Sequence, residues 1–333
     1  MGTLVGHVAP GFAFFALGLW HLFNHIKLHA INPNSYTSFP WFPTSKFRHL
    51  ELVLIMVCSS ISISMELFIG PVKHHPFDTD GTIPSNHLHN FEHSAISMTF
   101  LTYAAFAVVL DATDNIRPVA KYSLTQLLGA VAFAQQLFLF HLHSADHMGV
   151  EGQYHLLLQS AIVVCLATTL MGIGYPKSFL VSFTRSLSIL YQGIWLMVMG
   201  YMLWTPGLIP KGCFIHFEEG HQVVRCSTAT ALHRAKSLVN IGFSWTLIGV
   251  TIFAVSFYLV LVKLYGGKVE YSTLAHHEDE KFELGDDNDE TDDVESRKGQ
   301  RILHGEPKTF IHMGKGYAAM DIERYVGLHV SSR

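Results

Sequence analysis

The chain has 333 residues, of which 49% are hydrophobic and only 14% are charged, and its formal net charge is −4. This charged fraction is low for a soluble protein, and apolar runs of about 20 residues indicate lipid as the surrounding solvent. The sequence holds no soluble module with a basic face, so we expect no nucleic-acid partner.

The net charge conceals two regions of opposite sign. Residues 278–295 hold 11 of the 26 acidic residues and one basic residue, Lys281, which leaves 21 basic against 15 acidic residues elsewhere, or +6. Such an acidic run repels itself and is typical of disorder. We therefore predict a transmembrane domain over 1–265 and, over 266–333, a disordered cytosolic tail that is suited to protein partners.

Seven apolar segments are long enough to cross the roughly 30 Å of bilayer hydrocarbon as helices, which satisfy their own backbone hydrogen bonds. They span about Thr3–Ile26, Leu50–Gly70, Leu88–Leu110, Tyr122–His143, Tyr154–Ile173, Arg185–Trp204 and Leu238–Leu264. The predicted fold is an all-α polytopic membrane helix bundle with seven transmembrane helices in a lipid bilayer. Gly11 and Gly18 in the first segment permit close contact with another helix.

The orientation follows from the basic residues that flank the segments. One side has nine, namely Lys27, Lys46, Arg48, Arg117, Lys121, Lys177, Arg185, Lys263 and Lys268. The other side has five, namely Lys73, Lys211, Arg225, Arg234 and Lys236. The first side is therefore predicted to be cytosolic, with the C-terminus there and the N-terminus lumenal or extracellular.

The four cysteines fall into two kinds. Cys58 and Cys165 lie inside apolar segments and are expected to be free thiols that pack as small apolar groups. Cys213 and Cys226 share the polar loop before the last segment. That loop faces the oxidising side in the predicted orientation, so the two form a candidate disulfide.

Polar residues of five segments gather at the non-cytosolic face. Ionisable groups in membrane spans are costly and usually face a cavity or one another, and histidine is the commonest metal ligand. The candidate ligands of a divalent ion such as zinc are His7, Glu66, His93, His141, His143 and His155, with His89, Glu92 and His147 as weaker candidates. His141 and His143 would diverge by about 200° on an ideal helix, so both reach one ion only if the helix frays.

Other polar residues in the segments suggest a structural role. His21, His25 and His29 form an i, i+4, i+8 stripe that we interpret as a polar helix edge. Glutamines and an asparagine are expected to form interhelical hydrogen bonds. They are Gln135, Gln136, Gln159, Gln192 and Asn240.

Short motifs at the segment ends form an ordered series along residues 1–265. They are Gly6-His7 with Pro10-Gly11, Leu50-Glu51, Glu66, Glu92-His93-Ser94, His141 with His143, His155, Arg185, and Gln192-Gly193 with Trp195. In this order they resemble the plant branch of the transmembrane protein 45 family. The resemblance implies seven spans and no characterised molecular activity. Animal members carry a histidine where this chain has Gln153, and His147 is particular to this branch.

Three functions are open at this point. The first is a non-enzymatic membrane protein with a structural or regulatory metal site, acting in trafficking, stress response or ion handling. The second is a zinc-dependent lipid hydrolase of the membrane, in which Glu66 or Glu92 would act as the base. The third is a haem-binding membrane protein with histidine ligands on facing helices.

Overall fold

The computed structural model describes residues 3–69, 75–146, 149–218 and 221–266, with all of their side chains except those of Asn86, residues 143–146 and His221. The predicted disordered tail lies outside the described residues. The domain boundary near residue 265 therefore stays a prediction.

The predicted fold class is confirmed, since seven helices in the described part of the chain are long and apolar enough to cross a membrane. They are α1 (Leu4–Ile31), α2 (Leu50–Ser64, extended by a π-helical turn over Met65–Ile69), α3 (Leu88–Ala112), α4 (Pro118–Asp146), α5 (Val150–Gly174), α6 (Phe179–Trp204) and α7 (Ala229–Tyr265). Large apolar side chains such as Trp245 and Ile252 point outward, which is consistent with contact with a lipid bilayer.

Helix α7 begins at Ala229 rather than at the predicted Leu238. The side chain of Thr228 caps its first turn by accepting a hydrogen bond from the Ala231 amide, at 3.1 Å. The 37 residues of α7 extend about 55 Å at 1.5 Å per residue, which exceeds the hydrocarbon thickness. An apolar pattern detects only the part of such a helix that lies in lipid, so the polar first turns escaped prediction.

A β-hairpin precedes α7, where the sequence analysis expected only a loop. Strand β1 (Cys213–Glu218) pairs antiparallel with β2 (His221–Cys226), and Cys213 lies opposite Cys226. Apolar and polar residues do not alternate strictly in either strand, so the sequence does not distinguish the hairpin from a loop. The hairpin marks one end of the bundle, which we call the hairpin end.

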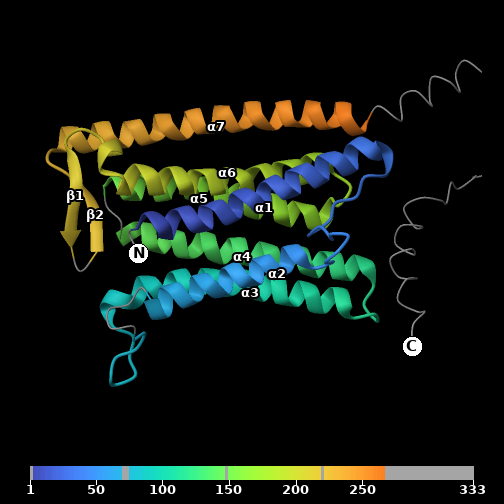
Figure 1. Ribbon diagram of the computed structural model, residues 1–333, viewed down its shortest axis with the longest axis horizontal. Helices are drawn as coiled ribbons and strands as arrows, with labels where there is room; N and C mark the ends of the chain where they lie inside the picture. The colour runs from blue at the N-terminus through green and yellow to red at the C-terminus, as the bar shows by residue number, and fades with distance from the viewer. Residues whose placement is uncertain (1–2, 70–74, 147–148, 219–220, 267–333) are drawn as a thin grey trace, which may run out of the picture. The chain divides into compact units, whose positions relative to one another are not determined.

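The helices run alternately toward and away from the hairpin end (Figure 1). From α2 to α6, each helix packs against the next one in sequence, whereas α1 packs mainly against α6 and α7 lies against α1, α5 and α6. The main core forms between α1, α5, α6 and α7. The first and sixth spans are therefore neighbours in space.

Glycines set the close approach of α1 to α6. A Cβ atom added to Gly11 would lie 2.9 Å from the Gly193 carbonyl oxygen, and one added to Gly18 would lie 2.8 Å from Leu190 Cβ. Such distances are shorter than side chains tolerate, so only glycine fits there. The prediction that Gly11 and Gly18 permit close helix contact is confirmed.

Residues 32–49, which we call the connector, fold back over the opposite end of the bundle, the connector end. The Ser38 amide donates to the Pro176 carbonyl at 2.7 Å, and the Tyr103 hydroxyl donates to the Pro40 carbonyl at 3.2 Å. The connector buries aromatic side chains, namely Tyr36, Trp41 and Phe42. It is thus a packed part of the fold rather than a solvated linker.

Candidate functional site

Four of the predicted site residues lie in one neighbourhood at the hairpin end, and we call them the hairpin-end cluster. They are His7 of α1, Glu66 of the π-helical turn, His93 of α3 and His155 of α5. All are buried except His93, which is half-buried. The start of an odd-numbered helix and the end of an even-numbered one meet at this end, which is why residues so far apart in sequence gather there (Figure 1).

His7 and His155 are held by the backbones of their own helices. Nδ1 of His7 lies 3.1 Å from the Thr3 carbonyl oxygen, and Nδ1 of His155 lies 3.0 Å from the Glu151 carbonyl oxygen. A carbonyl oxygen can only accept, so each Nδ1 carries the proton, and Nε2 is the unprotonated nitrogen of the neutral ring. The two ring centroids are 6.0 Å apart.

Trp204, at the end of α6, extends this cluster. Its ring stacks on that of His7 with a centroid distance of 4.4 Å. The indole Nε1 is buried and has no hydrogen-bond partner among the described residues. A buried donor without a partner is uncommon in folded proteins and marks a place where water or a ligand would bind favourably.

Glu66 joins the second and third spans. Its carboxylate accepts a hydrogen bond from Asn90 Nδ2 at 2.7 Å and lies 3.4 Å from His93 Nδ1. His93 is also within electrostatic reach of His7 and His155. Glu66 therefore faces α3 inside the bundle rather than lipid, next to the imidazole of His93.

The remaining predicted residues have varied positions. His141 is exposed on α4, with Nδ1 3.2 Å from Gln159 Oε1 of α5. Helix α4 continues through position 143, but the His143 side chain lies outside the described residues, as does all of His147. The rings of His89 and His93 are 6.4 Å apart, and Glu92 is half-buried on α3.

The described residues of this cluster do not form a complete metal site. Among the described residues, no three His, Cys, Asp or Glu side chains are arranged so that they could hold a metal ion. The side chain of His143 is outside that set. What the cluster offers is the pair of imidazoles of His7 and His155, with centroids 6.0 Å apart, and a buried carboxylate next to His93. Both are ligand types that zinc accepts.

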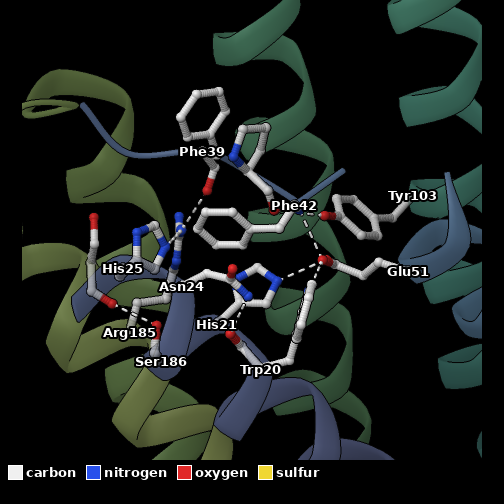
Figure 2. A network of polar contacts seen from close by, with 12 residues as sticks. Trp20, His21, Asn24, His25, Phe39, Phe42, Glu51, Tyr103, Arg185 and Ser186 are labelled. Carbon is white, nitrogen blue, oxygen red and sulfur yellow. Dashed lines mark hydrogen bonds and ion pairs between the residues drawn. The ribbon is translucent and has the colours of Figure 1, made fainter. Parts of the chain in front are cut away.

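A second buried polar group, the connector-end network, was not predicted (Figure 2). At its centre is Glu51 of α2, whose carboxylate accepts three hydrogen bonds. The donors are Trp20 Nε1 at 3.0 Å, His21 Nε2 at 2.7 Å and the Phe42 amide at 2.9 Å. Glu51 thereby ties α1 and the connector to α2.

His25 links the other half of this network to α6. Arg185 Nη2 donates to His25 Nε2 at 3.3 Å and to the Phe39 carbonyl at 3.1 Å. Because Arg can only donate, His25 accepts at Nε2 and donates from Nδ1 to the Tyr36 hydroxyl, 2.8 Å away. Burial raises the pKa of Tyr36 to about 12, so its hydroxyl stays neutral at physiological pH.

The interpretation of His21, His25 and His29 as a polar helix edge is wrong for the first two, because His21 and His25 are buried. His29 stacks on Phe179, with centroids 4.0 Å apart. Arg185 could have indicated this network from the sequence. It was interpreted as a charge that flanks a span, but it is buried within α6. A carboxylate and a guanidinium at the same end of two spans could have predicted partners for the imidazoles.

The hairpin has a covalent link and an ion pair. Cys213 and Cys226, the candidate disulfide of the sequence analysis, are bonded to each other across its two strands. Arg225 of β2 pairs with Glu218 of β1. Cys165 is a buried free thiol, as expected, whereas the free Cys58 is exposed on the outer face of α2, where lipid would contact it.

Comparison with known proteins adds a family match. Residues 122–259 match a family described as a family of unknown function (DUF716). The match begins in α4 and ends in α7, so it includes α5, α6 and the hairpin. The description attributes no activity to the family. The chain is thus similar, over this region, to uncharacterised proteins.

Proposed function

We propose that this chain is a non-enzymatic multi-pass membrane protein of the transmembrane protein 45 family, in its plant branch, and that it binds a divalent metal such as zinc at the hairpin end. Its cellular role would be in trafficking, stress response or ion handling. The ordered motifs of the seven spans and the match to an uncharacterised family support the family assignment. The metal site rests on the hairpin-end cluster.

One observation carries the metal proposal. His7 and His155 both donate Nδ1–H to a backbone carbonyl, an arrangement that fixes the tautomer and orients Nε2 as the ligand atom in metal sites. With Zn–N bonds of about 2.0 Å, two imidazoles on one zinc have centroids roughly 5 Å apart. The observed 6.0 Å requires only a small adjustment of the side chains.

The other ligands would come from the rest of the cluster and from α4. Glu66 supplies a negative charge that offsets part of the charge of a divalent ion, and His93 lies beside it. His141 and His143 are the candidates from α4. No contact among the described residues favours the hydrolase or the haem interpretation over this one.

The proposed orientation places the hairpin end on the lumenal or extracellular side. With Arg185 removed from the count because it is buried, eight basic residues still flank the connector-end side against five on the other. A disulfide between Cys213 and Cys226 fits an oxidising compartment. The acidic tail would then be cytosolic and available to protein partners.

Elemental analysis of the purified protein tests the metal site. We expect about one zinc per wild-type chain in preparations made without chelator, and loss of most of it in His155→Gln and His93→Ala. His29→Ala is the matched control, since it removes an imidazole from the opposite end of the same bundle. A wild type that carries no stoichiometric metal and takes up none from solution would refute the proposal.

Epitope tags test the orientation independently. A tag at Met1 should be accessible from the non-cytosolic side and a tag at Arg333 from the cytosol. Both tags on one side would contradict the arrangement of seven spans, and reversed accessibility would contradict only the orientation.

A further inference from the structure

The middle of the bundle holds two glutamines whose hydrogen bonds are incomplete. Gln136 Oε1 and Gln192 Nε2 are buried and have no hydrogen-bond partner in the described part of the chain, and both side chains are almost fully enclosed. Other glutamines behave as expected for interhelical bonding, since Gln135 donates to the Ala95 carbonyl and Gln153 to Asn240. Buried amides are ordinarily paired with protein or ordered water, so Gln136 and Gln192 require an explanation.

The two glutamines lie at the same level of the bundle. Phe133 of α4, Cys165 of α5 and Ile189 of α6 pack in one buried cluster. Gln136 follows Phe133 by three residues, and Gln192 follows Ile189 by three, a spacing that keeps each pair on one helix face. Helices α4 and α6 run in the same direction (Figure 1). Both amides therefore lie one turn nearer the hairpin end than this cluster.

The unpaired atoms are complementary in chemistry. Gln136 offers an acceptor and Gln192 offers a donor. Water both donates and accepts, so water molecules beside the two amides could satisfy both atoms. Cys165 Sγ lies 3.5 Å from Gln192 Oε1 and 3.3 Å from Ser188 Oγ, so the thiol is beside this position.

Polar groups continue from this level toward the hairpin end. Trp195 Nε1 donates to the Tyr154 carbonyl at 3.1 Å, which brings His155 to the level of the α6 turn next to Gln192. Gln159, one turn along α5 from His155, donates to the carbonyl of Phe140. His155 and Gln159 are four residues apart and so lie about 6 Å apart along α5, a separation that a single bridging water nearly spans.

In the other direction the polar series ends at a fixed charge. Ser188 lies one turn before Gln192 in α6, on the side of the connector end, and its hydroxyl donates to the Arg185 carbonyl. The Arg185 guanidinium is buried and held by His25 and the Phe39 carbonyl. A fixed guanidinium disfavours the passage of cations, and the connector covers this end.

We propose that the bundle interior holds a hydrated polar path that enters at the hairpin-end cluster, passes between Gln136 and Gln192 beside Cys165, and ends at Arg185. The path binds water and small uncharged solutes that carry both a donor and an acceptor. Trp204 Nε1, the unpaired donor beside His7, lies at its entrance. The path does not depend on a metal at that entrance.

Radiolytic hydroxyl-radical footprinting of the purified full chain tests this path, because radicals formed from internal water modify the side chains next to it. We expect Cys165, although fully buried, to be modified readily in the wild type relative to Met199, a fully buried residue of the main core. Gln136→Leu and Gln192→Leu remove the polar partners of the water at similar volume. Each substitution should lower the modification of Cys165 to the level expected of a buried thiol that has no water beside it.

The matched control is Gln135→Leu, which removes a neighbouring amide that bonds outside the path. It should leave the modification of Cys165 unchanged, and far-UV circular dichroism should report the same helix content for all variants. Equal modification of Cys165 in wild type, Gln136→Leu and Gln192→Leu would overturn the proposal.

The side of entry has its own measurement. In sealed vesicles of a Cys58→Ser background, Ag⁺ added at the hairpin end should block the Cys165 thiol, and Ag⁺ added at the connector end should not. Blocking from the connector end alone would overturn the assigned direction, and blocking from neither side would overturn the assigned entry at the hairpin end.

Discussion

The two ends of the bundle use the same residue types in different ways. At the connector end, Glu51 accepts three hydrogen bonds and both nitrogens of His25 bond to other parts of the chain. At the hairpin end, His7 and His155 are oriented by their own helices. The first arrangement joins segments to one another, whereas in the second each imidazole bonds to the backbone of its own helix. We infer that the connector end stabilises the fold, whereas the metal binding proposed above would give the hairpin end a different role.

The sharpest way to break this comparison is Glu51→Ala. It would leave Trp20 Nε1, His21 and the Phe42 amide without their acceptor in a buried position. We expect a loss of about 3–5 kcal/mol in the free energy of unfolding, measured by thermal denaturation in detergent. Asp111→Asn is the control, since its partners Arg48 and His49 are both partly exposed, and it should cost less than about 1 kcal/mol. Equal losses would remove the distinction between buried network and surface pair.

The covalent link allows the hairpin to be perturbed alone. Cys213→Ser should destabilise the hairpin by up to about 3 kcal/mol, since the disulfide closes a loop with a sequence separation of 13. Limited proteolysis should then cleave the hairpin sooner while the connector stays protected. On reduction, wild type and Cys58→Ser should both show a shift in electrophoretic mobility. Cys213→Ser should show no shift. Alkylation of both loop thiols without reductant would contradict the disulfide.

Tyr36→Phe tests how far the connector depends on His25. Loss of the hydroxyl leaves the His25 Nδ1–H unpaired in a buried site, at a cost of about 1–3 kcal/mol. The raised pKa of Tyr36 adds a test by pH, because its neutral form is favoured in the folded state. Its contribution is complete below about pH 10 and is lost as the pH rises toward 12.

Thermal denaturation as a function of pH separates these effects. Wild type should lose stability over this alkaline range more steeply than Tyr36→Phe. The exposed Tyr175→Phe should behave as wild type. Identical alkaline profiles for wild type and Tyr36→Phe would show that the pKa of the Tyr36 hydroxyl does not change on unfolding.

The smallest expected effect on stability is that of His7→Gln at the hairpin end. The ring gives up one hydrogen bond to its own helix and its stacking on Trp204, together about 1 kcal/mol. Thermal denaturation of metal-free protein should therefore show only a small shift, in contrast to Glu51→Ala. A shift as large as that of Glu51→Ala would indicate that the hairpin-end cluster, too, serves mainly to hold the fold.

The sequence determined the seven spans and the depth of the polar residues in them. An apolar run of about 20 residues is a local property, and alternating spans fix which end each residue reaches. His7, Glu66, His93 and His155 could therefore be placed at one end from sequence. Helix ends such as that of α7 and the short hairpin could not, because capping and strand pairing leave little apolar signal.

Only the tertiary structure decided which spans are neighbours. Helix α1 packs on α6 because Gly11, Gly18 and Gly193 allow the two backbones to approach, and this contact brings His25 to Arg185 across a sequence separation of 160. Lateral helix order depends on side-chain packing between distant segments, and no single segment carries it. The same packing encloses Gln136 and Gln192 at one level while leaving an atom of each without a partner among the described residues. The chain's apolar pattern alone thus predicts the bundle, but not the partners of the polar groups inside it.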